Sequence, residues 1–382
     1  MKILAIDVGT GTQDIFLFDS DQEIENCIKM VMPSPTQVMA GQVRAATRRG
    51  ESILITGVTM GGGPSHWAVM DHLRAGYYVC ATPRAAQTFD DDLEGVRRMG
   101  IEVVGDDEAA TLRVDRRIEF KDLYLEQVTG AIAAFGGDPE FDLLAVAVFD
   151  HGAAPPGYSD RIFRFDYIRD RVRENGGRIR PTFASFAFPA GEVPPSMTRL
   201  QAVADSYRGD KPVFVMDTGP AAVLGALEDS RVAGPRTALI VNVGNFHTLA
   251  FHLDGDRIAG LFEHHTGELS QAELIDYLAK LADGRLTNQE IYDDSGHGAF
   301  LADGSRSRPE ITAVTGPRRA LLADSAVQPY FAVPHGDMMI AGCFGLLRAV
   351  ADRCPDLAEP ITTRLDETQR RKGHRGDTRG QE

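Results

Sequence analysis

Two glycine-containing segments, far apart in the chain, have the residue types that bind phosphate. The first, DVGTGTQD, runs from Asp7 to Asp14, and the second, NVGNFHT, runs from Asn242 to Thr248. Glycine permits positive φ angles and lets backbone N–H groups approach an anion closely. Each segment lies between two short apolar runs, so we expect both to be turns between antiparallel strands. A plain hairpin is the alternative for either turn alone, because short glycine motifs recur by chance.

The second copy favours phosphate binding, because two such hairpins, one from each half of the chain, could clasp a polyphosphate between two domains. Asp7, at the end of a buried strand, is placed to hold a hydrated Mg²⁺ beside the phosphates, since hard cations prefer carboxylate and water ligands. The expected phosphate contacts are Gly9, Thr10, Gly11, Thr12 and Gln13 in the first turn, with Asn242, Gly244, Asn245, His247 and Thr248 in the second.

Two carboxylates at strand ends are candidates for the group that orients or deprotonates a nucleophile. The apolar run FDLLAVAVFD ends at Asp150, and KPVFVMD ends at Asp217. Phosphoryl transfer needs mainly positioning, charge neutralisation and one such group. Asp217 is favoured by its position in the motif, and Asp150 by its neighbour His151, which could share a proton with it. Helix capping or loop anchoring is the alternative for each.

The elements that must position these residues repeat along the chain. Strand, glycine turn, strand, polar turn and strand open the sequence, and TALIVNVGNFHTLAFHLDGDRIAGLFEHH repeats that order from Thr237. We expect an N-terminal half over residues 1–219, with an inserted cap or substrate loop around 155–195, and a C-terminal half over 220–352. Residues 353–382 are polar and rich in charge, and we expect a flexible tail there.

At these hairpins the sequence resembles the actin-like ATPase superfamily, which includes sugar kinases, Hsp70 and actin. The resemblance covers most of residues 1 to about 351. It implies an α/β fold of two duplicated ribonuclease H-like domains with a cleft between them, and ATP with Mg²⁺ as ligands. The segment VFVMDTGPAAVLGAL resembles the first connecting helix, which places Asp217 or Thr218 near the γ-phosphate. ITAVTGPRRALL resembles the adenosine motif, with Gly316 and Arg318 as contacts.

Further segments resemble other parts of these kinases. PHGDMMIAGCFGLLRA is similar to the second connecting helix, whose small residues let two helices cross closely. The segment with Gly62, Gly63 and His66 resembles the substrate-facing loop of glycerol kinase-type enzymes, and His265 falls where related kinases place groups near the substrate. His264 and His265 are not expected to form a metal site as a pair, because adjacent strand residues point to opposite faces.

The chain also departs from the superfamily pattern. Asn242 stands where many relatives have Asp, which removes one Mg²⁺ partner and favours slow hydrolysis. Over the whole chain, the sequence is similar to the family called domain of unknown function 1786, whose members often carry the label of pyruvate formate-lyase activating enzyme. That label implies a radical S-adenosylmethionine enzyme with a CxxxCxxC motif. Because the four cysteines lack this spacing, we predict no iron–sulfur cluster.

The composition excludes some classes of partner. The chain has 382 residues and a formal charge of −15, which argues against nucleic-acid binding because such binding rests on Lys and Arg. No apolar run approaches the roughly 20 residues that span a bilayer. The N-terminus leaves no room for a secretory h-region, and the scattered cysteines show no disulfide or zinc pattern, so we expect a cytoplasmic protein.

Three functions fit these residues. The first is an ATP-dependent phosphotransferase or ATPase acting on a small polar substrate, with closure of the two halves excluding water. The second is an ATP-driven activator or chaperone-like switch for a partner enzyme. The third is a non-catalytic nucleotide or metabolite sensor. The sequence leaves the acceptor and the oligomeric state open, a homodimer included.

Overall fold

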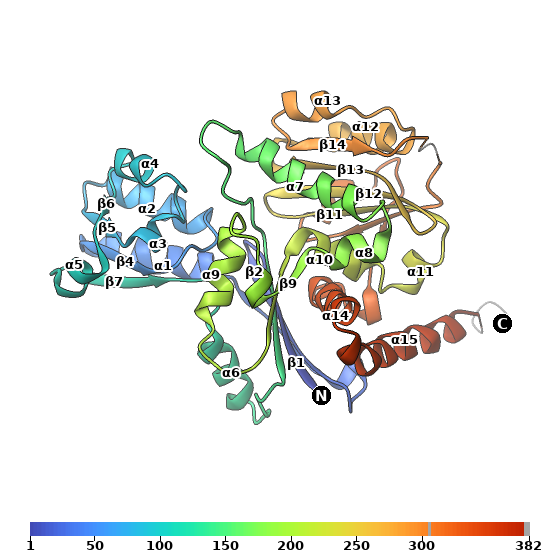
Figure 1. The fold of residues 1–382 in the computed structure, drawn as a ribbon, viewed down its shortest axis with the longest axis horizontal. Helices are drawn as coiled ribbons and strands as arrows, with labels where there is room; N and C mark the ends of the chain where they lie inside the picture. The colour runs from blue at the N-terminus through green and yellow to red at the C-terminus, as the bar shows by residue number, and fades with distance from the viewer. Residues whose placement is uncertain (305–306, 378–382) are drawn as a thin grey trace.

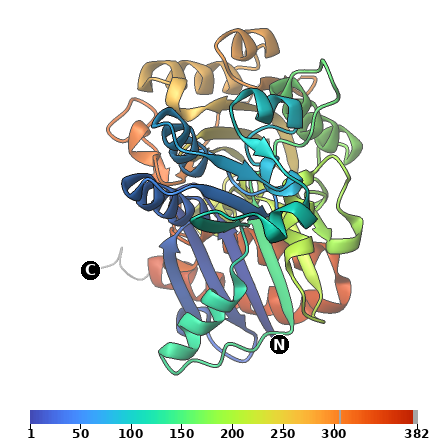
Figure 2. The ribbon, with the colours of Figure 1, turned by 90° about the vertical axis from the view of Figure 1, so that its left-hand side faces the viewer.

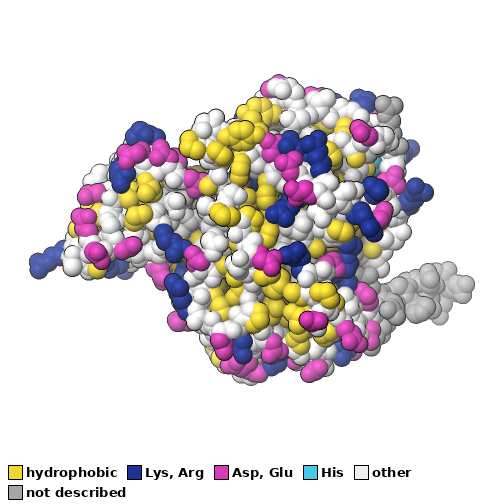
Figure 3. All heavy atoms as spheres, in the orientation of Figure 1, with side chains coloured by type: hydrophobic (Ala, Val, Ile, Leu, Met, Phe, Trp, Pro, Cys, Tyr) yellow, Lys and Arg dark blue, Asp and Glu magenta, His cyan; other side chains and the backbone are white. Residues whose placement is uncertain are grey.

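The computed structural model describes residues 1–304 and 307–377 and, within them, contains three β-sheets. Figure 1 shows two large sheets with helices around them and a smaller lobe set to one side. Among the described residues, no helix combines the length and the apolar character needed to cross a membrane. Acidic and basic side chains are interspersed over the face drawn in Figure 3.

The first large sheet has the order β3-β2-β1-β8-β10-β9. Its antiparallel meander consists of β1 (Lys2–Val8), β2 (Thr12–Asp19) and β3 (Ile28–Pro33), and β8 (Leu143–Val148) and β10 (Val213–Asp217) continue parallel to β1. The short strand β9 (Ala187–Pro189) closes the edge in the antiparallel direction. Every residue of β8, LLAVAV, is buried, as expected of a central parallel strand covered on both faces.

The second large sheet repeats this arrangement, with the order β14-β13-β12-β11-β15-β16. The strands β11 (Thr237–Val243), β12 (His247–Asp254) and β13 (Arg257–His265) form the meander, and β15 (Ile311–Thr315) and β16 (Tyr330–Phe331) run parallel to β11. The edge strand β14 (Gly298–Leu301) pairs with β13. Both sheets therefore consist of a three-stranded meander followed by parallel strands, which is the duplicated ribonuclease H-like fold of actin-like proteins, as predicted.

Two connecting helices join the halves, α10 (Thr218–Ala226) and α14 (Ala341–Arg353). They cross so closely that a Cβ on Gly225 would lie 1.8 Å from the carbonyl oxygen of Ala341, and one on Gly345 would lie 1.9 Å from that of Ala221. Any larger residue at either glycine would force the helices apart. The small residues of both helices thus permit the close crossing expected from the sequence.

The smaller lobe is inserted between β3 and β8 and forms its own four-stranded parallel sheet, β6-β5-β4-β7. Figure 2 views the molecule from the side of this lobe. Its core is separate from those of the large sheets. From the sequence, the residues of this lobe were expected to be part of the N-terminal half, residues 1–219, and were not predicted to form a lobe of their own. The lobe comprises α1 (Pro35–Arg49), β4 (Ile53–Gly57), α2 (Pro64–Arg74), β5 (Val79–Ala81), α3 (Pro83–Ala86), α4 (Leu93–Arg98), β6 (Glu102–Val103), α5 (Asp106–Thr111) and β7 (Arg116–Phe120).

The expected insertion around 155–195 contains α7 (Asp160–Glu174), α8 (Ile179–Ala184) and the edge strand β9. In Figure 1 α7 and α8 lie over the second sheet, and Phe183 of α8 packs against Phe251 of β12. This segment therefore contributes to the shared core of the two halves. The remaining helices are α6 (Leu125–Ala134), α9 (Thr198–Ser206), α11 (Ser230–Ala233), α12 (Gln271–Ala282) and α13 (Asn288–Asp293).

The C-terminal segment differs from the flexible tail expected over 353–382. Helix α15 (Pro355–Asp377) follows α14, and its side chains Ile361 and Leu365 are fully buried in the core shared by both halves. These two apolar residues, four positions apart, lie on one face of the helix. The last residues of the expected tail, 378–382, lie outside the described part of the chain.

Candidate functional site: a cavity between the two halves

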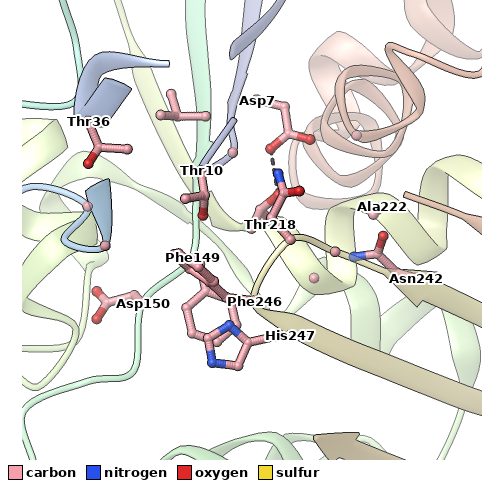
Figure 4. A pocket seen from close by; sticks show the side chains of 18 of the residues that line it. Asp7, Thr10, Thr36, Phe149, Asp150, Thr218, Ala222, Asn242, Phe246 and His247 are labelled. Carbon is pink, nitrogen blue, oxygen red and sulfur yellow. Dashed lines mark hydrogen bonds between the residues drawn. The ribbon is translucent and has the colours of Figure 1, made fainter. Parts of the chain in front are cut away.

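A cavity of about 410 Å³ lies where the two halves and the lobe meet. Figure 4 shows side chains that line it, among them Asp7, Thr218, Asn242 and His247. Both predicted hairpins contribute to its wall, and so do the first residues of α10 and α14. The lobe contributes the loop Thr59–Gly63 and part of the loop after α3.

The two hairpins are closed in the same way. The N–H of Gly9 donates to the carbonyl of Thr12, and the N–H of Gly244 donates to that of His247, each at 2.9 Å. A Cβ on Gly244 would lie 2.7 Å from the His247 carbonyl oxygen, and one on Gly9 would lie 3.1 Å from that of Thr12. A side chain at Gly244 would therefore clash with the backbone of its own turn, and the space beside Gly9 is tight in the same way.

The tip of the second hairpin contacts both the first hairpin and the lobe. A Cβ on Gly11 would lie 2.9 Å from the Asn245 amide nitrogen, and one on Gly63 would lie 2.5 Å from the Phe246 ring. Phe246 also packs edge-on against Trp67 of α2, with ring centroids 5.5 Å apart. The structure thus has the halves and the lobe closed around the cavity.

A pair of carboxylates lies beneath the first hairpin. Asp7 and Asp14 are directly opposite each other on β1 and β2, and both line the cavity. The Thr218 hydroxyl donates to Asp7 Oδ1 at 2.5 Å, whereas the buried Asp14 Oδ1 has no hydrogen-bond partner among the described residues. Burial raises the pKa of Asp7 to about 6, and burial together with the neighbouring Asp7 raises that of Asp14 to about 8. Two close carboxylates of this kind suit a divalent cation.

Gly342, near the start of α14, leaves space for the Asp7 carboxylate only because glycine has no side chain. A Cβ on Gly342 would lie 1.8 Å from Asp7 Oδ2. Asp7 was predicted as a cation ligand and Thr218 as a residue near the γ-phosphate, whereas Asp14 and Gly342 were not predicted from the sequence. The register of the β1–β2 hairpin was the signal that could have found Asp14, because residues 7 and 14 must face each other if Gly9 closes the turn.

Most of the predicted phosphate contacts line the cavity, and three do not. Gln13 instead donates to the Pro33 carbonyl and lies in a separate apolar groove. Thr248 is buried, and its hydroxyl forms a hydrogen bond with the Thr266 hydroxyl at 3.0 Å. Gly11 faces Asn245 and is not among the lining residues. The residues that do line it are Asp7, Gly9, Thr10, Thr12, Asn242, Gly244, Asn245 and His247.

Asp217 requires a correction, because it does not line the cavity. The Arg164 guanidinium forms a bidentate ion pair with it, and its Oδ1 also accepts the Gly219 N–H at 3.0 Å. Asp217 and Arg164 are both fully buried. A carboxylate held in this way cannot take a proton from a substrate in the cavity. Asp217 is instead the N-cap of α10, the alternative that the sequence left open.

Asp150 does line the cavity and is also held by backbone groups. Its Oδ1 accepts the Gly152 N–H and its Oδ2 accepts the Leu200 N–H, both at 2.8 Å. Burial raises the pKa of Asp150, although these two hydrogen bonds oppose the shift. Each oxygen retains a further lone pair. Of the two strand-end carboxylates, only Asp150 is placed to contact a ligand.

Of the two predicted adenosine contacts, one lines the cavity and the other does not. Gly316 lines the cavity with φ 97°, and a Cβ there would lie 2.4 Å from the Val243 carbonyl oxygen. Arg318 is exposed and does not line it, whereas the next residue, Arg319, does and donates to the Gly316 carbonyl at 3.0 Å. The turn after β15 therefore presents its second arginine to the cavity.

The predicted substrate residues divide in the same way. Gly62 and Gly63 line the cavity, but His66 does not; it packs against Phe89, with ring centroids 5.5 Å apart. Nor does His265 line the cavity; it packs against His297 behind the second hairpin. Arg199, which is not among the predicted site residues, also lines the cavity and pairs with the buried Asp122 at 2.7 Å.

Comparison with known families assigns the chain. The family model described as "Putative pyruvate format-lyase activating enzyme (DUF1786)" matches residues 60–321. The chain belongs to this family. This confirms the family predicted from the sequence. In this DUF1786 protein the four cysteines are free and lie on separate parts of the fold, with Cys80 in β5 and Cys343 in α14.

Solved structures also resemble this DUF1786 protein. The ROK hexokinase from Thermus thermophilus is 13% identical over 68% of this chain and 47% of its own, with a TM-score of 0.21. The Ppx/GppA family member from Aquifex aeolicus is 10% identical over 97% of this chain and 91% of its own, with a TM-score of 0.28. The chain thus spans about half the length of the hexokinase. A comparison with curated proteins finds no match.

Proposed function

We propose that this protein binds ATP with Mg²⁺ in the cavity and acts as a phosphotransferase or ATPase on a small polar substrate. One observation carries the proposal: two hairpins, at equivalent positions of two duplicated halves and closed by the same hydrogen bond, line one cavity. Its volume, about 410 Å³, lies within the range of small-molecule sites, roughly 300–1,000 Å³.

The cavity offers backbone donors for a polyphosphate. The N–H groups of Gly9 and Gly244 close their own turns, so the turns would offer the N–H groups and polar side chains of their other residues, such as Thr10 and Asn245. Thr218 and Gly219 at the start of α10, and Ala341 and Gly342 at the start of α14, also line the cavity. Helix N-termini carry unpaired N–H groups and a partial positive charge, which favours anions. Hairpins and helix starts together support phosphate placement between the halves.

The charge of the cavity makes a cation necessary for this ligand. Two arginines line it, Arg199 and Arg319, and Arg199 is already paired with Asp122. A polyphosphate would be repelled unless Mg²⁺ neutralised part of the charge. Asp7 and Asp14 would hold this ion directly or through water, which explains the unpartnered Asp14 oxygen. The acidic lining residues are Asp7, Asp14, Asp91, Asp150 and Glu263.

The halves and the lobe line the cavity with different residue types. Gly316, Arg319 and the methionines Met338 and Met339 come from the C-terminal half and would suit a planar base between apolar side chains. The lobe loop and Asp150 would form the end where an acceptor binds. There, Asp150 would accept the proton that an acceptor hydroxyl or water loses, while bound ATP supplies the phosphoryl group.

Titration calorimetry with ATP tests nucleotide binding. We expect binding with Mg²⁺ and little or none with EDTA, and we expect Asp7→Asn to weaken the Mg²⁺-dependent binding by tenfold or more, as an order-of-magnitude estimate for a lost charged ligand. Asp283→Asn, in an exposed ion pair far from the cavity, is the matched control. Absence of binding of ATP, ADP and a nonhydrolysable analogue at millimolar concentration would refute the proposal.

Turnover measurements test the role of Asp150. Asp150→Asn should lower turnover of ATP by about 10²-fold or more if Asp150 is a general base, with the affinity for Mg²⁺·ATP nearly unchanged. Thermal melting of the same variant separates this effect from a loss of structure, because Asp150 also accepts the Leu200 N–H at the start of α9. If the folded variant turns over ATP at the wild-type rate, the activator or sensor function gains support.

A further inference from the structure

Three histidines from separate parts of the chain converge beside the cavity. His151 follows β8 in the first half, His247 begins β12, and His297 precedes β14. One ring nitrogen of each lies within 4.8 Å of the corresponding nitrogens of the other two. The ring centroids are 5.1 Å apart for His151 and His247, 5.9 Å for His151 and His297, and 5.1 Å for His247 and His297. We call these three residues the histidine triad.

The triad leaves ring nitrogens without hydrogen-bond partners. His297 is 1% exposed, and neither of its ring nitrogens has a partner among the described residues; the same holds for His247 Nε2. Leaving such buried polar atoms unpaired is destabilising, because folding removes their hydrogen bonds to water without replacing them. Native structures rarely retain several of them in one place without a ligand. Their convergence therefore points to a species that accepts imidazole lone pairs.

Aromatic and backbone groups surround the triad. Phe149 and His247 lie side by side (Figure 4), and their rings stack with centroids 4.0 Å apart. The backbone N–H of His297 donates to the Glu263 carbonyl at 2.9 Å. A neighbouring histidine, His265, donates its Nδ1–H to the Ser295 carbonyl at 2.7 Å, which leaves its Nε2 as an acceptor, and its ring centroid is 4.6 Å from that of His297. Phe149 thus restrains the orientation of the His247 ring, and the His297 backbone is fixed at the end of β13.

We propose that His151, His247 and His297 bind one divalent transition-metal ion, such as Zn²⁺, with an open coordination position toward the cavity. Zn–N bonds of about 2.0–2.1 Å place tetrahedral ligand nitrogens about 3.4 Å apart. The triad atoms, which all lie within 4.8 Å of one another, need to approach by about 1.4 Å at most. Side-chain rotations of the three histidines would bring them together, and His151 is exposed and so has room to move.

The chemistry of the triad distinguishes this site from the carboxylate pair. Neutral imidazoles prefer Zn²⁺, Fe²⁺, Co²⁺, Ni²⁺ or Cu²⁺, whereas Mg²⁺ prefers oxygen ligands. Asp7 and Asp14 lie on the first hairpin, whereas the triad includes His247 of the second hairpin. The inference goes beyond nucleotide binding and does not depend on it.

The position of the triad gives the ion access to a substrate. His151 and His247 line the cavity together with Asp150, at the end where an acceptor would bind. Three protein ligands and one open position are the arrangement of catalytic zinc sites, in which a water or substrate oxygen occupies the fourth place. The substrate class that this favours is a small molecule with a hydroxyl or carboxylate oxygen that can coordinate the ion.

Metal titration of the full chain without an affinity tag tests the site. We expect about one equivalent of Co²⁺ to bind, with the visible absorption bands of a low-coordinate nitrogen site, and Zn²⁺ to displace it. His151→Ala, His247→Ala and His297→Ala should each weaken Co²⁺ binding by about 100-fold or more, given that loss of mere outer-shell partners costs 10–100-fold. His66→Ala, which removes a histidine outside the triad, should bind as the wild type does.

Asp7→Asn separates the two metal sites. It should leave Co²⁺ binding unchanged even if it abolishes Mg²⁺·ATP binding, so that failure of nucleotide binding and failure of the triad site are distinguishable. His151→Ala is the decisive triad variant, because an exposed side chain can be removed without opening the core. Absence of stoichiometric Co²⁺ binding, or equal affinity in His151→Ala and wild type, would overturn the proposal. Loss of Co²⁺ binding in Asp7→Asn alone would assign the ion to the carboxylates and overturn it as well.

Discussion

Arg164 and Asp217 form a bidentate ion pair that is shielded from solvent. Arg164 lies on α7 in the segment over the second sheet, and Asp217 ends a strand of the first sheet. The same guanidinium also pairs with Glu263 of β13 at 3.2 Å and donates to the Asp150 carbonyl at 3.0 Å. Arg164 thereby links Asp217, at the end of β10 in the first sheet, to Glu263 of β13 in the second sheet.

This pairing predicts an unequal response to substitution of the two partners. Arg164→Met leaves two buried carboxylates without their cation and should lower the free energy of unfolding by about 3–5 kcal/mol. Asp217→Asn leaves Arg164 paired with Glu263 and should cost less, about 1–3 kcal/mol. Urea unfolding of both variants measures the difference, with Arg285→Met in an exposed pair as control.

The same variants decide the role of Asp217. Folded Asp217→Asn should bind Mg²⁺·ATP with nearly wild-type affinity, because Asp217 does not line the cavity. An Asp217→Asn variant that is as stable as the wild type but does not turn over ATP would contradict the structural role. It would restore Asp217 as a catalytic candidate.

The comparison of sequence and structure shows which features local patterns encode. The hairpins were predictable because strand alternation and the glycine turn are local, and their repetition revealed the duplicated fold. Asp217 was misjudged because its partner Arg164 is 53 residues away in the chain, and a strand-end aspartate looks the same whether it binds a ligand or an arginine. The histidine triad comes from three distant segments, so no spacing announces it. The short strands β5 and β6 gave too little pattern to separate the lobe.

The carboxylate pair predicts how stability depends on pH in the absence of metal. Burial raises the pKa of Asp7 to about 6, and burial with the neighbouring Asp7 raises that of Asp14 to about 8, both above the value of about 3.9 in an unfolded chain. Between about pH 4 and pH 8 the folded state therefore binds more protons than the unfolded state. Its stability from these groups should fall as the pH rises through that range.

Urea unfolding in EDTA at pH 5, 6, 7 and 8 measures this dependence. Asp14→Asn should reduce the loss of stability between pH 5 and pH 8, whereas Asp21→Asn, at an exposed site, should follow the wild type. If Asp14→Asn and wild type lose stability in parallel, the pKa of Asp14 is not raised as the structure implies.

Gly342 predicts a steric test of the Mg²⁺ site. Gly342→Ala would place a methyl group within 1.8 Å of Asp7 Oδ2, so Asp7 must leave its position beside Thr218. Mg²⁺·ATP affinity should fall by tenfold or more on the same order-of-magnitude grounds as for loss of the carboxylate. Gly130→Ala on α6 is the matched control, since a Cβ there meets nothing within 4 Å and alanine favours the helix. Wild-type affinity in a folded Gly342→Ala variant would show that Asp7 is not part of the site.

Trp67 predicts an intrinsic signal for ligand binding. It is the single tryptophan of the chain, is 54% exposed on α2, and packs edge-on against Phe246 of the second hairpin. Phosphate bound by this hairpin should shift Phe246 and change the environment of the Trp67 ring, because the two rings are only 5.5 Å apart. Titration with ATP and Mg²⁺ should therefore change the Trp67 emission, with a midpoint equal to the calorimetric Kd.

Phe246→Leu separates the signal from the binding. It removes the ring next to Trp67 but keeps the backbone of the hairpin, so calorimetric affinity should stay within about threefold, a difference of under 1 kcal/mol, while the emission change is lost. Asp7→Asn should lose both, because it weakens binding itself. An unchanged emission in wild type, at concentrations where calorimetry detects bound ATP, would show that the nucleotide does not engage the second hairpin. The phosphates would then lie on the first hairpin and the helix starts alone.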